Sequence, residues 1–276
     1  VRAAVQSGAN AVQIGFGEFP ARGNSQGCTE EELAAAARYC RVRGCRFYFT
    51  LDTLVHDDEL EAAVTLAVAA AKHGADAIVV QDTGMVSILR KVLPDMPLHG
   101  SVRMNVHSLA GVNAAAEMGL SRVMLAPELS REEIAGIAAA SPIELGVYAH
   151  GALCVSYAGQ CYMSSLLNGS SDNRGMCTQP CLLDYSLGSR MDDHPLSLRD
   201  NCLVQQLNAL NEIGIRSVLL EGSNMRAEYI SMITTMYEEA QRIGKTPTEA
   251  ELEQLQELFS SQGFTDGYFS GERGKG

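Results

Sequence analysis

Four of the chain's 8 cysteines lie close together, between residues 154 and 181. Cys154, Cys161, Cys177 and Cys181 are separated by six, fifteen and three residues, in a segment rich in glycine, serine and asparagine. Soft thiolates in sets of four bind zinc or an iron–sulfur cluster. Zinc sites usually combine short C-x2-C pairs. The uneven spacing therefore favours a four-iron, four-sulfur cluster held by one long loop, with zinc as the alternative.

Other interpretations of these cysteines remain open. Disulfides are disfavoured because no signal peptide is recognisable and the other four cysteines are scattered along the chain. Buried, inert cysteines are common singly, but four together in a polar loop are not expected. Cys177 and Cys181 could form a redox pair, although three residues separate them instead of the usual two. Reduced cysteines indicate a cytoplasmic location.

Composition limits the class of protein. The 276 residues suit one large α/β domain or two ordinary ones, and 46% are hydrophobic, as expected of a folded globular chain. No apolar run approaches the roughly eighteen residues that cross a bilayer, so we expect a soluble protein. The net charge of −12 argues against broad electrostatic capture of nucleic acid, although a local patch around residues 38–46 stays open.

A recurring sequence pattern indicates a parallel sheet. Four times, a helical pattern ends in glycine, a few small or polar residues follow, and an apolar strand comes next, as at Gly8, Gly74, Gly119 and Gly214. Strands that are buried on both faces and alternate with helices form a parallel sheet covered by helices. We predict seven strands, at about residues 11–15, 46–51, 77–81, 98–102, 122–126, 144–149 and 216–221. We predict helices at residues 30–43, 59–73, 86–92, 112–118, 131–140, 203–213 and 227–242.

Seven strands and an opening helix with no strand before it predict a TIM-like (β/α)8 barrel whose first strand is missing from this chain. The barrel would span residues 1–243, with a cysteine-rich insert at about 151–200. Residues 244–276 would form a linker and the start of a truncated C-terminal module. An open doubly wound sheet is the second choice, but no Gly-x-Gly-x-x-Gly motif follows a strand.

Barrel enzymes carry their chemistry where strands end and the next loops begin. The cysteine-rich loop follows the strand ending at His150, so we expect it over the same mouth. Four polar residues at strand ends are candidate catalytic groups: Asp82, Asn105, His150 and Glu221. Gln81 and Ser101 are candidate substrate-binding groups. The alternatives are a helix N-cap or first-turn charge for the carboxylates and a hydrogen-bonded packing residue for His150.

One segment resembles a known signature. Glu144, His150-Gly-Ala, Cys154, Gly159, Cys161 and Ser164 stand where the collagenase-like peptidase family U32 has its signature residues, and the match continues through Asn173-Arg174-Gly175. The resemblance extends over Gly8-Ala-Asn-Ala-Val, Gln81-Asp82 and Met104-Asn105-Val-His107, to about residue 243. The family name implies proteolysis of collagen-like chains. Its better understood relatives are hydroxylation proteins for transfer RNA, ribosomal RNA or ubiquinone that carry a four-iron cluster.

The resemblance also implies site residues and partners. It makes Cys154, Cys161, Cys177 and Cys181 the cluster ligands, with Cys202 as a possible substitute for Cys181. An RNA, a small molecule or a peptide is the expected substrate, and a homologous protein is a candidate partner.

The chain departs from the family pattern at Asp52, where relatives have asparagine, and at Arg103, where they have glutamine. Ser223 stands where a basic residue is usual, which leaves Arg226 as the basic candidate for binding substrate.

Two function classes follow. In the first, an iron–sulfur cluster at the barrel mouth supports hydroxylation of an RNA base. In the second, the site is a peptidase, which needs an activated nucleophile or a metal-bound water. Four thiolates saturate a metal and leave no position for water, which favours the first. A non-catalytic redox or structural cluster is a third possibility.

Overall fold

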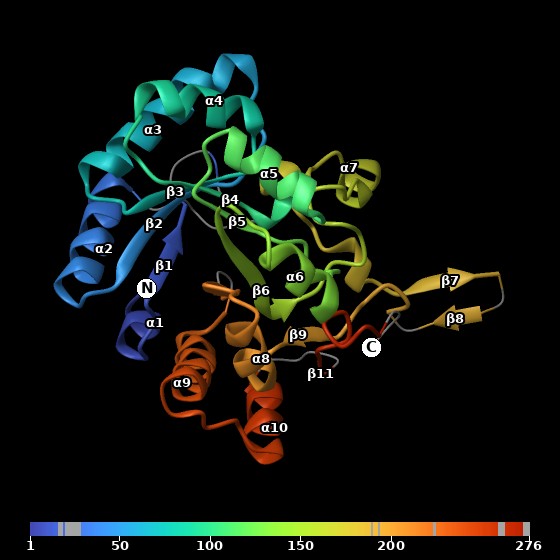
Figure 1. Cartoon of the computed structure of the whole chain (residues 1–276). Helices are drawn as coiled ribbons and strands as arrows, with labels where there is room; N and C mark the ends of the chain where they lie inside the picture. The colour runs from blue at the N-terminus through green and yellow to red at the C-terminus, as the bar shows by residue number, and fades with distance from the viewer. Residues whose placement is uncertain are drawn as a thin grey trace.

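The computed structural model describes residues 1–15, 19, 29–188, 190–192, 194–222, 225–258 and 263–272. Seven parallel strands form its centre, in the order of the chain (Figure 1). They are β1 (Ala11–Ile14), β2 (Arg46–Leu51), β3 (Ala77–Val80), β4 (Leu98–Gly100), β5 (Arg122–Met124), β6 (Glu144–Ala152) and β10 (Ser217–Leu220). All seven predicted strands are present, and the predicted α/β class with a mostly parallel sheet is confirmed.

Helices alternate with these strands and cover the outside of the curved sheet (Figure 1). They are α1 (Arg2–Gln6), α2 (Glu30–Val42), α3 (Leu60–Lys72), α4 (Thr83–Val92), α5 (Leu109–Glu117), α6 (Arg131–Ala138), α8 (Leu207–Glu212) and α9 (Ala227–Ile243). Local chemistry sets their starts: Thr29 and Ser130 each accept from a backbone N–H three residues on, and Glu32 and Glu133 complete the capping boxes.

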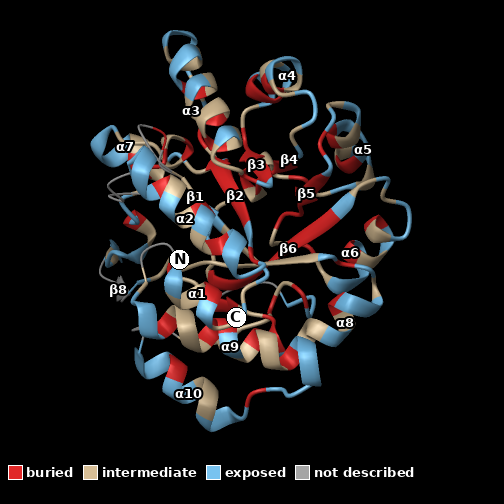
Figure 2. Ribbon diagram, turned by 90° about the vertical axis from the view of Figure 1, so that its left-hand side faces the viewer, coloured by how far each residue is buried: buried red, intermediate tan, exposed pale blue. Residues whose placement is uncertain are grey.

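Both faces of the sheet are buried, as Figure 2 shows for the central strands. Alternate residues of β2 belong to two separate apolar clusters: Phe47 and Phe49 join the large cluster beneath the helices, and Tyr48 joins a small one with Ala77 and Val79. Because successive strand residues point to opposite faces, the second cluster lies inside the curve of the sheet. This two-sided burial explains why the strands are apolar throughout.

The two ends of the sheet do not pair with each other among the described residues. Within the described residues, β1 pairs with β2 alone and β10 pairs in parallel with β6 alone. Helices α1 and α9 pack against each other between these ends, and Ser7 and Ser231 share a hydrogen bond of 2.6 Å there. The part of the chain that the structure describes does not close into a complete eight-stranded barrel.

Short strands add to the sheet where the sequence indicated a loop. β9 (Asp200–Cys202) runs antiparallel to the end of β6, and β11 (Phe264–Thr265) pairs with β9. A separate hairpin joins β7 (Tyr185–Leu187) to β8 (Arg190–Asp192). None of these four short strands pairs with β1 or β10 among the described residues.

The C-terminal residues contact the rest of the fold. Helix α10 (Glu249–Leu258) packs on α9, and the buried Phe269 belongs to the large core cluster. The division into a barrel at 1–243 and a linker with a truncated module at 244–276 stays a prediction. No helix among the described residues is long and apolar enough to cross a membrane.

Candidate functional site

Asn173 attaches the cysteine-rich segment to the end of β3. It lies in a short 3-10 helix, η3 (Asp172–Arg174), and is buried. Its side-chain amide donates to the Gly159 carbonyl oxygen over 3.0 Å and accepts from the Gln81 amide over 3.0 Å. The Leu54 N–H donates to the Asn173 carbonyl over 2.9 Å. Gln81, a predicted substrate-binding residue, therefore holds the segment in place.

Arg103 makes the second attachment. It lies in η2 (Val102–Met104), after β4, and its side chain is 5% exposed. The guanidinium donates to the Asp52 carbonyl oxygen over 2.7 Å, lies 3.5 Å from the Asp52 carboxylate and donates to Asp172 over 3.2 Å. Asp52 and Arg103, two of the residues at which the sequence departs from the expected family pattern, are thus direct partners. Their opposite charges explain how both are tolerated in a buried place.

Arg174 makes the third attachment. Its guanidinium donates to both carboxylate oxygens of Glu59 and, over 2.5 Å, to the Leu54 carbonyl. The hydrogen bonds from Arg174 lower the pKa of Glu59 to about 2. A bidentate pair of this kind is fixed in direction as well as distance.

The four loop cysteines differ in exposure. Cys154 is exposed, and Cys161, Cys177 and Cys181 are half-buried. Burial raises the pKa of Cys181, and the nearby charges of Cys177 and Cys161 raise it further. The Gln179 N–H points at the Cys177 sulfur over 3.4 Å.

Cys202 has different surroundings. It lies in β9 beside Tyr237, and burial raises the pKa of its thiol. Within the described ranges, no three His, Cys, Asp or Glu side chains are close enough to hold a single metal ion. Zinc requires its thiolates within about 2.3 Å of one point. A four-iron cluster is held by four thiolates, which is the number that Cys154, Cys161, Cys177 and Cys181 supply.

Two of the predicted site residues act as helix caps. Asp82 accepts from the Met85 N–H over 2.9 Å at the start of α4 and from the Val55 N–H over 3.2 Å. Ser101, buried, accepts from the Arg103 N–H at the start of η2. Their catalytic and binding roles stay predictions, and the observed contacts are those of the structural alternative.

His150 is fully buried among aromatic rings. Its Nε2 lies 2.8 Å from the Tyr229 hydroxyl, and its ring also contacts Tyr237 and Phe264. The pairing of β10 with β6 shifts by one residue beside Ala149, and such a bulge re-aims the following side chain. Burial lowers the pKa of His150 to about 4, so the imidazole is neutral at pH 7. The hydrogen bond and ring contacts of His150 are thus with Tyr229, Tyr237 and Phe264, whereas Asp82 accepts from Val55 and Met85.

The remaining predicted residues lie at strand ends. Asn105 has a left-handed backbone (φ 58°), and its side-chain oxygen is buried with no hydrogen-bond partner among the described residues. The Glu221 N–H donates to the His150 carbonyl at the end of β10. Arg226 is exposed at the start of α9. Ser223 lies outside the described residues.

Sequence reasoning assigned no role to His107 and Glu128, which meet beside Asn105. His107 Nε2 lies 3.5 Å from the Glu128 carboxylate, and Nδ1 lies 3.0 Å from the Asn105 carbonyl oxygen. A carbonyl only accepts, so Nδ1 carries a proton. Tyr157 of the cysteine-rich segment packs edge-on against the imidazole. The sequence does contain a feature that could identify this pair, because His107 and Glu128 each follow a strand of the parallel sheet.

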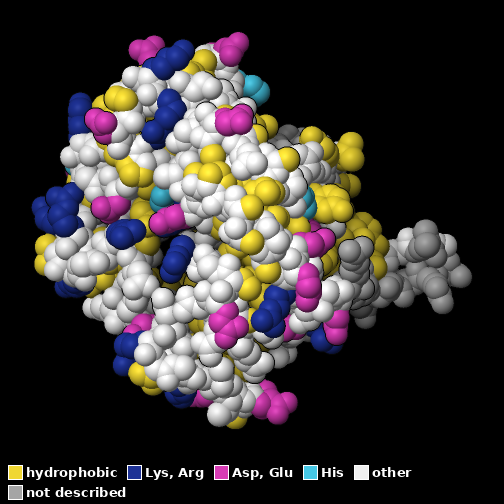
Figure 3. Space-filling model, in the orientation of Figure 1, with side chains coloured by type: hydrophobic (Ala, Val, Ile, Leu, Met, Phe, Trp, Pro, Cys, Tyr) yellow, Lys and Arg dark blue, Asp and Glu magenta, His cyan; other side chains and the backbone are white. Residues whose placement is uncertain are grey.

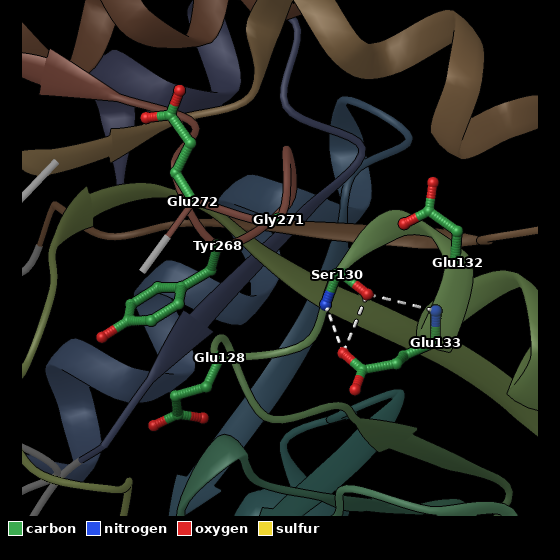
Figure 4. A pocket seen from close by; sticks show the side chains of 7 residues that line it. All are labelled: Glu128, Ser130, Glu132, Glu133, Tyr268, Gly271 and Glu272. Carbon is green, nitrogen blue, oxygen red and sulfur yellow. Dashed lines mark hydrogen bonds between the residues drawn. The ribbon is translucent and has the colours of Figure 1, made fainter. Parts of the chain in front are cut away.

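Glu128 also lines a cavity of about 160 Å³ between the start of α6 and the C-terminal residues. Figure 4 shows the Tyr268 ring and the Glu128 carboxylate on the same side of this cavity. Burial raises the pKa of Tyr268, and the charges of Glu128 and Tyr157 raise it further. His107, Glu128, Tyr157 and Tyr268 therefore converge from four separate parts of the chain.

The surface of the cysteine-rich segment is apolar. Helix α7 (Met163–Asn168) leaves Leu166 85% exposed and Leu167 61% exposed, with Tyr162 beside them at 60%. Figure 3 shows hydrophobic side chains grouped on the right of this face, where α7 lies. Exposed apolar side chains grouped in this way are typical of contact surfaces.

The family model of peptidase family U32 matches residues 1–276. The chain belongs to peptidase family U32. In this U32 chain, the cysteine-rich segment is attached to the ends of β2, β3 and β4 through Asp172, Asn173 and Arg174.

Curated relatives of this U32 chain carry two kinds of name. The "23S rRNA 5-hydroxycytidine C2501 synthase" of Escherichia coli (strain K12) is 36% identical over 86% of this chain and 36% of its own length. The "tRNA hydroxylation protein P1" of Bacillus subtilis (strain 168) is 28% identical over 86% and 59%. The "Collagenase" of Porphyromonas gingivalis (strain ATCC BAA-308 / W83) is 29% identical over 98% and 71%. The chain thus spans about a third to three fifths of the first two relatives.

Proposed function

We propose that this chain is the barrel part of an iron–sulfur protein that acts in the hydroxylation of RNA bases. The observation that carries the proposal is the attachment of the cysteine-rich segment to the carboxyl ends of β2, β3 and β4. Parallel α/β enzymes bind ligands at that end of their strands. The names of relatives that hydroxylate ribosomal and transfer RNA support the same choice.

Cys154, Cys161, Cys177 and Cys181 would hold the cluster. A bound cluster would supply iron-based redox chemistry beside the substrate. The buried environment of Cys202 beside Tyr237 favours Cys181 over Cys202 as the fourth ligand.

The residues around His107 would bind the planar polar ring. Among the described residues, a side-chain oxygen of Asn105 and one of Glu128 accept no hydrogen bond, so both could accept one from a substrate. A charged His107 could donate one from Nε2. The exposed ring of Tyr157 offers a face on which a base can stack. These groups replace His150 as our first choice for substrate contact, because His150 is enclosed by Tyr229, Tyr237 and Phe264.

A peptidase remains the second candidate, favoured by the likeness to the collagenase. Gene deletion separates the two functions. We expect the deletion strain to lose one hydroxylated nucleoside in mass spectra of digested ribosomal or transfer RNA, and the restored full-length gene to return it. An unchanged nucleoside profile, together with gelatin cleavage by the purified full-length protein, would favour the peptidase.

A further inference from the structure

The helix η3 attaches the cysteine-rich segment to the barrel through three consecutive side chains. Asp172 accepts from Arg103, after β4; Asn173 accepts from Gln81, at the end of β3; and Arg174 donates to Glu59, after β2. Each side chain contacts a different strand-to-helix connection. Such an arrangement fixes both the position and the orientation of the turn.

Arg103 lies at the centre of this attachment. Its side chain is 5% exposed, and its two carboxylate partners, Asp52 and Asp172, are 13% and 17% exposed. Charges so well covered are little screened by solvent, so each depends on its partners. The Arg103 guanidinium binds Asp52, after β2, and Asp172 of the cysteine-rich segment at once.

The backbone of Arg103 makes a further contact with the segment. Gly159 has a φ of +74°, and a Cβ atom at that position would lie 2.3 Å from the Arg103 carbonyl oxygen. The Gly159 carbonyl in turn accepts from Asn173. Residues 159 and 173, which precede Cys161 and Cys177, are thus held on the same patch of barrel.

We propose that protein contacts alone hold the cysteine-rich segment on the barrel before any cluster binds, and that Arg103 is the positioning residue for Cys161, Cys177 and Cys181. The link to cluster binding rests on the proposed function, whereas the attachment of the segment does not. Many small metal sites fold only when the metal binds. Here the thiols would instead be presented in advance by Arg103, Asn173 and Arg174.

Thiol labelling of the iron-free, full-length protein tests this directly. A maleimide reagent is added, and the labelling rate of each cysteine is followed by peptide mass spectrometry. In the parent protein we expect Cys154, which is exposed, to react first, and Cys161, Cys177 and Cys181 to react about tenfold more slowly. The buried Cys40 and Cys45 report whether the barrel itself stays folded.

The variant Arg103→Gln should release the segment. We expect about tenfold faster labelling of Cys161, Cys177 and Cys181, no labelling of Cys40 or Cys45, and less iron after anaerobic reconstitution. Arg103→Lys should lie between, because one ammonium cannot reproduce the guanidinium fork. Arg131→Gln is the control, since the Arg131 side chain forms an exposed ion pair with Glu212, away from the cysteine-rich segment.

Two results would overturn the proposal. Equal labelling of all four loop cysteines in the parent would mean that the segment is not held before iron binds. Unchanged labelling in Arg103→Gln would mean that Arg103 does not position it. If Arg103→Gln exposes Cys40, Asp172→Asn decides instead, because it removes only the segment's side of the contact. A parent that holds its segment but binds no iron would refute the proposed cluster and leave the attachment standing.

Discussion

The imidazole of His107 links the ends of two neighbouring strands: Nε2 lies 3.5 Å from the carboxylate of Glu128, after β5, and Nδ1 donates to the backbone of Asn105, after β4. Nδ1 is therefore engaged with that carbonyl, and Nε2 faces the Glu128 carboxylate. The facing oxygen of Glu128 is buried with no hydrogen-bond partner among the described residues. Such unused capacity in a buried place indicates a water or a ligand group.

Glu128→Gln should therefore impair the proposed reaction without affecting iron binding. The amide retains the shape of the side chain but loses the charge that accepts an N–H from a substrate ring and pairs with His107. Removing a charged hydrogen-bond partner costs about 1.5–3 kcal/mol, which corresponds to a fall of about tenfold to a hundredfold in the rate of the reaction. The level of the hydroxylated nucleoside should fall with it. The level is measured by mass spectrometry in a deletion strain that carries the variant.

Glu132→Gln is the matched control for that experiment. Glu132 borders the same cavity but is exposed at the start of α6. We expect it to behave as the parent does. A loss of iron in Glu128→Gln would assign the residue to the cluster site rather than to substrate binding.

The pattern of the sequence was sufficient for the strands but not for the site. Glycine after a helix and a doubly buried strand are local signals, and they located β1 to β6 and β10 to within a few residues. Strand β9 was missed because Asp200-Asn201-Cys202 carries no apolar pattern. It forms only because it meets the end of β6.

The roles of the site residues were harder to predict, because a polar residue at the end of a strand can cap the next helix or bind a distant segment. Asp82 and Gln81 are neighbours in the sequence, yet Asp82 caps α4 and Gln81 binds Asn173, more than ninety positions away. His150 also follows the expected alternation until the bulge in β6 turns it toward Tyr229. Bulges and long-range hydrogen bonds leave no local signal in the sequence.

The cluster proposal predicts opposite outcomes for two cysteine variants. Cys161→Ser should lose the brown colour and most of the iron of anaerobic preparations, because a hydroxyl is a poor ligand for iron in such clusters. Cys202→Ser should retain both, since Cys202 lies beside Tyr237 in β9. Equal iron in Cys161→Ser and the parent, or stoichiometric zinc in the parent, would contradict the cluster.

His150 predicts how the stability of the fold depends on pH. Burial lowers its pKa to about 4 from the usual 6.5. Between these two values the unfolded chain binds the proton and the folded chain does not, so stability falls as the solution is acidified from pH 6.5 to pH 4. The full effect is about 3 kcal/mol. The measurement is urea unfolding of the iron-free protein at several pH values. The free energy of unfolding should fall less steeply between pH 6.5 and pH 4 in His150→Phe than in the parent.

A histidine elsewhere provides the comparison. The pKa of His99 is also lowered to about 4 by burial, and its contribution is the same in the parent and in His150→Phe. Glu59, with a pKa lowered to about 2, acts mainly below pH 4.5. If the free energy of unfolding depends on pH in the same way in His150→Phe and in the parent, His150 is accessible to protons in the folded state.

Gly159 and Gly169 provide the closest matched pair in the cysteine-rich segment. Both have left-handed backbones, with φ of +74° and +76°, so alanine is strained equally at either position. They differ in their surroundings: a Cβ at Gly159 meets the Arg103 carbonyl oxygen at 2.3 Å, whereas a Cβ at Gly169 has nothing within 4 Å. Gly169→Ala should therefore cost about 1 kcal/mol of stability and retain the iron.

Gly159→Ala must push the segment away from the barrel, and we expect loss of most iron and digestion after Arg174 by trypsin. Cleavage is followed by the mass of the fragment that ends at Arg174, which the parent protects through the ion pair with Glu59. Similar iron content and similar cleavage in the two variants would show that the close approach of Gly159 to Arg103 does not hold the segment.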